Sequence, residues 1–542
     1  MNEMNRASSV PETQAASNSV NYAGSMNAVN VPTASLRQPI ERPKFSIERK
    51  DVIYAVLSAV LCIFSVATVS ENGFYAGFTA CYLAFFALVT SYCVNKQTRL
   101  KPYSFLCGIL SVTSSLTFSV SDSFSVKFRT IAVLFLTSAI WFDSLNGGRS
   151  ERGEMSVIGN VFKTTFGQSC KYLPCSMRSL FAPKRVISGT ALKVIVGVAC
   201  ALPVALVVVP LLISSDAAFD GLVSSFAADM SSVPLYVFLG LAITPFLISY
   251  CYSLKKVARV ESNKSKFAGI SDAYIVAFLS VVAVIYLVYL FSQLAYFFSA
   301  FSGILPVGYE FSVAEYARRG FFEMCTISAI NFVLIFGSIL LSRKVNDKPS
   351  MAVRLLCTFI GVFTAALSVT AISKMILYIG CFGMTFLRIA TSAFLVFLFI
   401  VSAILVVKCF APKLHVVRTA IAAAACILIV LGFADVDRVV AEYNTAAYLN
   451  GALKTVDVST VIGTSEAGIP SLVKLATDSR SEVSSEAKAA LDDAVEYMYN
   501  VEYDSDGNAV YRRNATMGSW SLSAKRAYDA LDKYIDNNRS NR

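Results

Sequence analysis

The sequence predicts an all-α integral membrane protein, a bundle of about eleven transmembrane helices followed by a small, mainly helical extracytoplasmic module. The first reason is composition: 55% of the 542 residues are hydrophobic and only 15% are charged, whereas soluble domains carry about 25% charged residues. The second is that apolar runs recur at lengths that span about 30 Å of hydrocarbon, which takes about 20 helical residues. The third is that basic charge alternates between the segments joining these runs.

Three parts of the chain differ in character. Residues 1–45 are rich in Ser, Asn, Ala and Val without periodicity, so we expect a disordered cytoplasmic tail that buries too little apolar surface to fold. The transmembrane domain is predicted over 51–434, and the C-terminal module over 435–542. The predicted spans are 52–70, 74–94, 103–120, 128–145, 188–213, 233–254, 271–298, 321–341, 352–376, 385–407 and 417–434.

Basic residues predict the orientation. With a cytoplasmic N-terminus, the cytoplasmic segments hold 25 Lys and Arg, seven of them in the long loop 145–187, whereas the opposite segments hold 3. Positive residues accumulate in cytoplasmic loops. The pattern therefore predicts a multi-pass protein with its N-terminus cytoplasmic and its C-terminus extracytoplasmic.

The C-terminal module is acidic, with 17 Asp and Glu against 12 Lys and Arg. Its stretch YDSDGNAVY (503–511) is typical of a β-hairpin with the turn at Asp506-Gly507. The glycine comes too early for a calcium loop. Apolar residues recur at the spacing of short amphipathic helices in 436–449, 469–476, 486–499 and 523–535.

Several kinds of active site are excluded by composition. The only histidine is His415, beside a basic loop, which excludes a Ser-His-Asp triad and a multi-histidine metal site. Cys170 and Cys175 share a loop but lack the two further ligands of a zinc site. The sequence contains no phosphate-cradling glycine loop. We therefore expect no catalytic set, no metal and no cofactor, and an enzyme would have Glu323 as its acid or base.

A cluster of charged residues is expected at the outer face, where three spans meet. The stretch EYARRGFFEMC (315–325) opens one span, and helical spacing puts Glu315, Arg319 and Glu323 on one stripe. The next span ends with SKMILYIG and the following one begins with GMTFLRI. The charged residues that converge at this depth, with Tyr378 beside them, are Glu315, Arg318, Arg319, Glu323, Lys374 and Arg388.

Three interpretations of this cluster stand side by side. In the first, the charges staple the helix entrance and snorkel to lipid headgroups. In the second, the surplus of two cations forms a pocket for a phosphate, a carboxylate or a headgroup, which arginine binds through its bidentate fork. In the third, the cluster is a docking site, and its missing negative charges come from the acidic module or from Asp216, Asp220 and Asp229 in an outer loop.

Two segments of the membrane domain, EYARRGFFEMCTISAINFVLI (315–335) and KMILYIGCFGMTFLRIATSAFLVFL (374–398), resemble bacterial polytopic membrane proteins catalogued as domain of unknown function four-one-seven-three, with relatives under four-one-five-three. The module segments AEYNTAAYL (441–449) and VDVSTVIGTSEAGIPSLVKL (456–475) resemble the Asn-containing helix and the Pro-x-Leu segment of that family. The resemblance covers roughly 190–480, with Met384 where leucine is usual, and it implies no reaction. The motif residues coincide with the charged cluster: Glu315, Tyr316, Arg318, Gly320, Glu323, Tyr378, Gly383, Thr385 and Arg388.

The leading hypothesis is binding or transport of an anionic small molecule or lipid at the outer face of the bacterial cytoplasmic membrane. The cations of the cluster would hold the ligand, and Glu315 and Glu323 would hold their geometry. The alternative is a membrane scaffold or sensor whose outer module docks on the cluster, and a membrane enzyme without histidine or metal comes third. The expected partners are membrane lipids, including anionic headgroups at loop 145–187, and an envelope protein bound through 435–542. Nothing in the sequence organises a nucleic-acid site.

Overall fold

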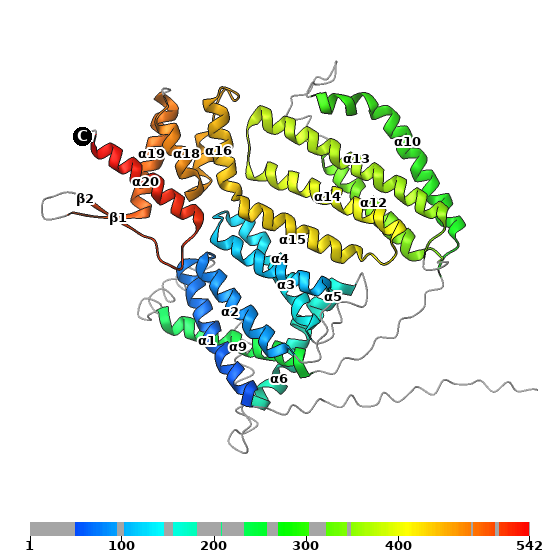
Figure 1. Cartoon of the computed structure of the whole chain (residues 1–542), viewed down its shortest axis with the longest axis horizontal. Coiled ribbons are helices and arrows are strands. Elements are labelled where there is room, and N and C mark those ends of the chain that lie inside the picture. The colour runs from blue at the N-terminus through cyan, green and yellow to red at the C-terminus, as the bar shows by residue number, and fades with distance from the viewer. Residues whose placement is uncertain are drawn as a thin grey trace, which may run out of the picture. The chain divides into compact units, whose positions relative to one another are not determined.

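The protein is described by a computed structural model over residues 49–94, 102–145, 156–180, 208, 232–256, 269–302, 321–343, 348–478, 481–503 and 509–540. These segments are almost entirely helical, with one two-stranded sheet (Figure 1). The architecture confirms the predicted all-α helical bundle. The tail 1–45 lies outside the described residues, and so does the predicted outer loop 299–320 from residue 303 onward.

Nine helices in the described segments are long and apolar enough to cross a membrane, and each overlaps a predicted span. Of the two other predicted spans, 188–213 lies outside the described residues except for Val208, and 103–120 corresponds to a shorter helix. The nine helices are α1 (Arg49–Asn72), α2 (Ala76–Cys93), α4 (Phe124–Ser144), α9 (Ser232–Lys256), α10 (Asp272–Ser302), α12 (Phe321–Leu341), α13 (Met351–Phe382), α14 (Phe386–Phe410) and α15 (Val416–Ala434).

The shorter helix, α3 (Pro102–Leu116), continues into the 3₁₀ turn η1 (Thr117–Ser119). Together they extend roughly 28 Å, close to the thickness of the hydrocarbon core. The helix carries serines, and its polar atoms meet partners on α2. The hydroxyls of Tyr82 and Ser111 are hydrogen-bonded to each other, and Thr79 Oγ1 donates to the carbonyl of Ser115 (2.8 Å). Neighbouring helices therefore satisfy the polar groups that make α3 less hydrophobic than the other spans.

The helices α10, α12, α13 and α14 enclose one core. Leu279, Ile335, Ile360 and Leu405, one from each helix, are almost completely buried there. A polar chain crosses the same group of helices, because Tyr286 Oη donates to Asn331 Oδ1 (2.5 Å) and Asn331 Nδ2 donates to Thr364 Oγ1 (2.9 Å). These bonds fix the relative rotation of the helices, since the alternative is an unsatisfied polar group inside the bundle.

Part of the predicted basic loop 145–187 is helical. The segment consists of α5 (Ser156–Phe162), the π-helical turn η2 (Lys163–Gln168) and α6 (Ser169–Leu180). Its apolar residues Val157 and Val161 are buried against α3 and α4, whereas Phe162 and Phe166 are exposed. The segment is thus packed on the bundle along one face.

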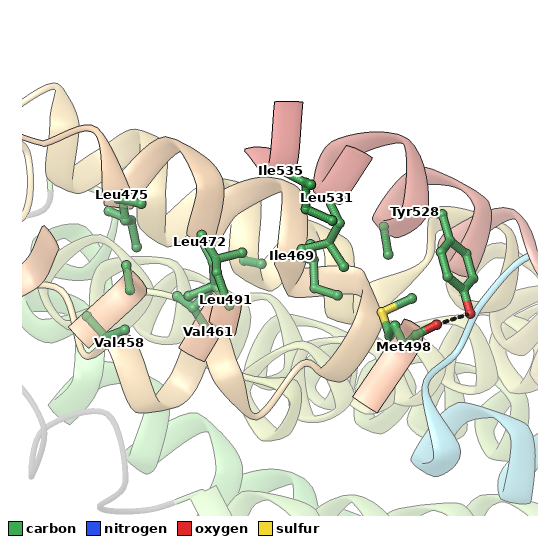
Figure 2. Packing of buried hydrophobic residues seen from close by; sticks show 14 of the residues in the cluster. Val458, Val461, Ile469, Leu472, Leu475, Leu491, Met498, Tyr528, Leu531 and Ile535 are labelled. Carbon is green, nitrogen blue, oxygen red and sulfur yellow. Dashed lines mark hydrogen bonds between the residues drawn. The ribbon is translucent and has the colours of Figure 1, made fainter. Parts of the chain in front are cut away.

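The C-terminal module is built around a core of its own (Figure 2). Leu472, Leu475, Leu491 and Leu531 are almost completely buried in it, and Tyr528 Oη donates to the carbonyl of Met498 (3.3 Å). Its helices are α16 (Val436–Leu449), α17 (Val458–Ile462), the 3₁₀ turn η3 (Ser465–Gly468), α18 (Ile469–Ala476), α19 (Ser481–Met498) and α20 (Leu522–Ser540). All four predicted amphipathic helices are present, and two of them have the predicted bounds.

The predicted hairpin is also present in the module. Strands β1 (Tyr499–Tyr503) and β2 (Ala509–Arg513) pair antiparallel with Tyr503 opposite Ala509. The expected turn at Asp506-Gly507 itself falls within residues 504–508, which are outside the described part of the chain.

The module contacts the ends of several membrane helices on one side of the bundle. The amide of Ala76, at the start of α2, donates to the carbonyl of Trp520 (3.2 Å), and the amide of Ser523 donates to the carbonyl of Val120, directly after η1 (3.2 Å). The module also follows directly from the end of α15. The segment before α2 and the segment after η1, which the sequence assigns to the same membrane face, therefore both contact the module.

Candidate functional site

The structure describes four of the seven residues in the predicted outer-face cluster. The charged stretch that opens α12 lies largely before its first described residue, Phe321. Outside the described residues are Glu315, Arg318 and Arg319; described are Glu323 in α12, Lys374 and Tyr378 in α13, and Arg388 in α14.

Arg388 and Tyr378 are in contact at the turn between α13 and α14. Arg388 Nη1 donates to the carbonyl oxygens of Phe382 (2.8 Å) and Gly383 (2.5 Å), where α13 ends. The last carbonyls of a helix have no intrahelical partner and carry its negative dipole end. The guanidinium carbon lies 4.2 Å from the centroid of the Tyr378 ring, within the range of a cation–π interaction. Arg388 thus stabilises the end of α13.

The turn itself requires its sequence. Gly383 has φ 77° and ψ −175°, a region that is essentially restricted to glycine. Thr385 precedes α14, and its hydroxyl accepts from the amide of Arg388 (3.4 Å). The predicted motif residues at these positions therefore shape the backbone.

Lys374 and Glu323 lie on adjacent helices. Met324 in the first turn of α12 packs against a cluster that contains Ala371 of α13 and Leu395 of α14. Lys374 is half-buried one turn beyond Ala371, whereas Glu323 is exposed and forms no ion pair with any described residue. The helix turns that carry Lys374 and Glu323 therefore lie close together, but the two side chains do not form an ion pair with each other.

Asn444 of α16 connects the module to the same turn. Its Oδ1 accepts from the amide of Met384 (2.6 Å), and its Nδ2 donates to the Met384 carbonyl (2.8 Å). A Cβ atom at Gly383 would lie 2.6 Å from Asn444 Oδ1. We name this arrangement of Gly383, Met384, Arg388 and Asn444 the turn clasp. It joins the Asn-containing helix of the module to the turn before α14.

A second group of charged residues was not identified as a site from the sequence. Lys127 Nζ lies 3.3 Å from Asp122 Oδ1, and the two side chains are 8% and 4% exposed. The ammonium also lies 3.5 Å from the centroid of the Tyr75 ring. In the sequence, Lys127 is one of the three basic residues in the segments opposite the cytoplasmic ones. A buried ion pair gains strength from low dielectric and costs much desolvation, so one partner depends on the other.

Two carboxylates of the module side approach this ion pair. Burial, with the negative charge of Asp122 next in effect, raises the pKa of Glu466 to about 7. Burial also raises the pKa of Asp437 to about 6, although a hydrogen bond from Ser123 acts in the opposite direction. Lys127 opposes both shifts. These two groups therefore exchange protons near neutral pH, where ordinary carboxylates are ionised. We name Asp122, Lys127, Asp437 and Glu466 the junction cluster.

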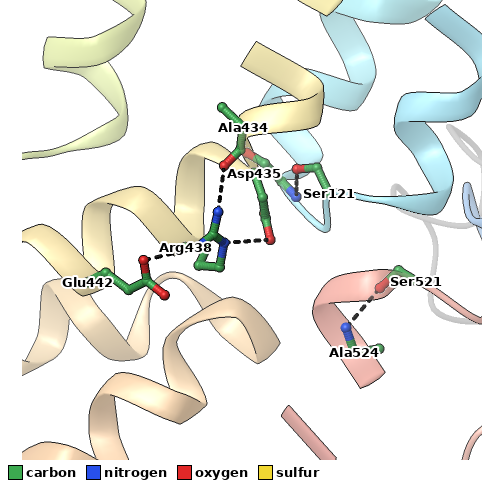
Figure 3. A network of polar contacts seen from close by, with 8 residues as sticks. Ser121, Ala434, Asp435, Arg438, Glu442, Ser521 and Ala524 are labelled. Carbon is green, nitrogen blue, oxygen red and sulfur yellow. Dashed lines mark hydrogen bonds and ion pairs between the residues drawn. The ribbon is translucent and has the colours of Figure 1, made fainter. Parts of the chain in front are cut away.

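Asp435, the residue directly after α15, supplies a further carboxylate near the junction cluster (Figure 3). It is completely buried and has φ 54°, in the left-handed region. Arg438 Nε lies 3.9 Å from its Oδ2, and Arg438 Nη1 donates to Glu442 Oε2 (3.0 Å). Burial raises the pKa of Asp435. The sharp bend between α15 and α16 is thus held beside the junction cluster.

The junction cluster faces a cavity of about 710 Å³ between the membrane domain and the module. Acidic groups and aromatic rings line it together, a combination that suits protons and positively charged ligands. No group of three or more acidic, Cys or His side chains in the described ranges is arranged to hold a metal ion. The residues that line the cavity include Tyr75, Asp122, Phe124, Asp437, Glu466 and Tyr497.

The comparisons with known proteins identify a family. No significant match to the chain was found among curated proteins or among solved structures. A family model described as "Domain of unknown function (DUF4153)" matches residues 57–475. The sequence had suggested family four-one-seven-three over roughly 190–480, with four-one-five-three as its relatives; the match is to the latter and begins much earlier in the chain. The chain belongs to the DUF4153 family of proteins with a domain of unknown function.

Proposed function

We propose that this integral membrane protein is a scaffold or sensor whose C-terminal module works while docked on the ends of the membrane helices. The turn clasp carries the proposal. Asn444 bonds both the amide and the carbonyl of Met384, so it satisfies both backbone polar groups of this residue, as a fixed docking contact does. The motif that suggested an outer-face site is then an attachment site for the module.

The junction cluster supports a sensing role. Its carboxylates lie at the boundary between the module and the membrane domain, and Glu466 and Asp437 have pKa values of about 7 and about 6. A proton or a cation that enters the adjacent cavity changes the charge at this boundary. Such a change in charge alters docking if it changes the free energy of the docked arrangement more than that of the undocked one.

The proposal is tested with Asn444→Ala, with Asn450→Ala as the control. Asn444 is buried in the clasp, whereas Asn450 is exposed at the end of the same helix. We expect Asn444→Ala to increase hydrogen exchange of α16 and of residues 383–388 by about tenfold, which corresponds to the loss of about 1.4 kcal/mol of hydrogen bonding. Equal exchange in the two variants would contradict docking through the clasp.

The proposed location is the bacterial cytoplasmic membrane, with the module outside. It is supported by the 25 basic residues on one side against 3 on the other. A cysteine introduced at position 450 is expected to react with a membrane-impermeant maleimide in intact cells, and one at position 260 is not. Labelling in the reverse pattern would invert the orientation.

Anion binding at the outer face is the second candidate. Arg388 uses Nη1 for both backbone carbonyls, and its other guanidinium nitrogens have no acceptor among the described residues. They are available for a phosphate or carboxylate, with Lys374 one helix turn away from Tyr378. Native mass spectrometry of Arg388→Lys should show less of a co-purifying anionic lipid or solute than wild type. Unchanged occupancy would leave Arg388 with its structural role alone.

A further inference from the structure

An apolar groove runs between α1, α2 and α9 within the membrane-spanning segments. Its volume is about 430 Å³, within the usual range of small-ligand sites. In a membrane, the molecules that fill such a groove are alkyl chains. Its walls include Cys62, Val66, Val69, Phe78, Phe85 and Leu247.

A polar cavity of about 450 Å³ begins where this groove ends. On α1, Val69 and Ser70 line the groove, and the next two residues, Glu71 and Asn72, line the cavity. Tyr75 lines the cavity less than one helical turn before Phe78 of the groove. The two spaces therefore adjoin along α1 in the order of an amphiphile, with the apolar part in the membrane and the polar part at its surface.

The charges of the polar cavity include both signs. Glu71 and Glu466 supply carboxylates, and Glu466 Oε2 is buried without a hydrogen-bond partner among the described residues. Arg513 and Lys525 supply cations from the module, and Arg513 is oriented by ion pairs with Asp532 and Asp529. An ammonium fits between the carboxylates, and a phosphate fits at the cations.

The aromatic and hydroxyl groups of the cavity match the same two charges. The rings of Tyr75, Tyr497 and Trp520 line it, and aromatic faces attract an ammonium. The hydroxyls of Thr516 and Ser519 also line it, and they are donors for phosphate oxygens.

The rim of the cavity lies where α1 ends and α2 begins. The loop Asn514–Trp520 is attached to the start of α2, because the amide of Gly77 donates to the carbonyl of Gly518 (3.0 Å). From this position Met517 and Trp520 are 96% and 45% exposed. Tryptophan concentrates at membrane–water interfaces, and methionine adapts to irregular apolar surroundings. Both side chains are thus positioned to contact lipid headgroups.

We propose that the groove and the polar cavity together bind one phospholipid whose headgroup carries both a phosphate and an ammonium. One alkyl chain occupies the groove, the ammonium lies at Glu71 and Glu466, and the phosphate lies at Lys525 and Arg513. The inference rests on the proposed docking of the module, because the cavity has one wall on each part. It also names the membrane component that the docked module would detect.

The reporter for the test is Trp520, because the chain contains two tryptophans and the other, Trp141, is buried. The full-length Trp141→Phe variant in detergent is titrated with phosphatidylethanolamine or phosphatidylglycerol carrying brominated chains. We expect half-maximal quenching of Trp520 at a concentration of phosphatidylethanolamine about tenfold lower than that of phosphatidylglycerol. One charge-assisted hydrogen bond to the ammonium would provide a difference of this size. Equal affinity for the two lipids would overturn the headgroup assignment.

Two variants separate the headgroup contact from the groove. Glu71→Gln changes an exposed residue and should remove the preference for phosphatidylethanolamine. Val66→Phe fills the groove and should weaken binding of both lipids about tenfold, whereas Val56→Phe, at an exposed position of α1, should leave binding unchanged. If Val66→Phe binds lipid as tightly as the control, the groove does not hold the chain.

Docking is checked separately with a cysteine pair at Asn72 and Thr516, whose side chains are hydrogen-bonded across the boundary. Disulfide formation in Asn72→Cys/Thr516→Cys, absent from both single variants, reports the docked module without lipid binding. A crosslinked protein that shows no lipid preference would overturn this inference alone. Failure to crosslink would overturn the docked arrangement and the lipid site with it.

Discussion

The turn clasp and the junction cluster both join the module to the membrane domain, but they differ in the kind of interaction. In the clasp, the amide of Asn444 and the guanidinium of Arg388 bond backbone groups of a single turn. In the junction cluster, Asp122 is paired with Lys127, and the charge of Lys127 also acts on Glu466. The difference indicates that the clasp fixes the position of the module, while the junction cluster makes its attachment depend on conditions.

The largest effect is expected from Lys127→Met in the junction cluster. It leaves Asp122, which is 4% exposed, without its partner, and breaking such a pair costs about 3–5 kcal/mol. The measurement is thermal unfolding of the purified protein in detergent at pH 7. The double variant Asp122→Asn/Lys127→Met should recover most of the loss, because no unpaired charge remains. A single variant as stable as wild type would show that the pair does not support the junction.

An intermediate effect is expected from Gly383→Ala in the clasp. The added Cβ would meet Asn444 Oδ1 at 2.6 Å in a backbone conformation that disfavours alanine. We expect a loss of about 2–3 kcal/mol in unfolding free energy, independent of pH. Gly380→Ala is the matched control, because a Cβ there meets no atom within 4 Å. Equal stability of these two variants would argue against the clasp.

The smallest effect is expected from pH, and it should be confined to the junction cluster. Since the pKa of Glu466 is raised from 4.5 to about 7, its contribution to stability is complete below pH 4.5. It is lost as pH rises through 7. We expect the docked protein to lose about 1–2 kcal/mol between pH 5 and 8, less than a full shift because the group is partly solvated. Glu466→Gln should remove the part of the loss near pH 7 and leave the part near pH 6 that Asp437 contributes, whereas Glu482→Gln, on an exposed residue, should not change the profile.

The sequence predicted the helices well because their signals are local. The helices over 436–449 and 469–476 have the predicted bounds, since the amphipathic repeat of a soluble helix starts and stops with its buried face. The membrane helices follow from hydropathy alone. Among the predicted spans that the structure describes, α3 alone falls short in apolar length, and its polar groups find partners in α2.

The candidate site was harder to predict because its contacts join distant parts of the chain. The motif near Gly383 and the helix containing Asn444 are both recognisable in the sequence. The sequence does not show that the side-chain amide of Asn444 bonds the backbone of Met384, which lies 60 residues earlier in the chain. Asp122 and Glu466 belong to different parts of the molecule, and each resembles an ordinary surface carboxylate. Their raised proton affinity comes from tertiary burial, which no local pattern encodes.

The polar α3 also bears on how the protein is made. Ser104, Ser111, Ser114 and Ser115 are completely buried in the finished bundle, but during synthesis they would face lipid or the protein-conducting channel. A segment this short and polar gains little by entering the bilayer alone. It is therefore expected to enter as a pair with the more hydrophobic α4, after α2 is in place to receive its hydroxyls. The order of these helices along the chain is then also the order in which they are expected to enter the membrane.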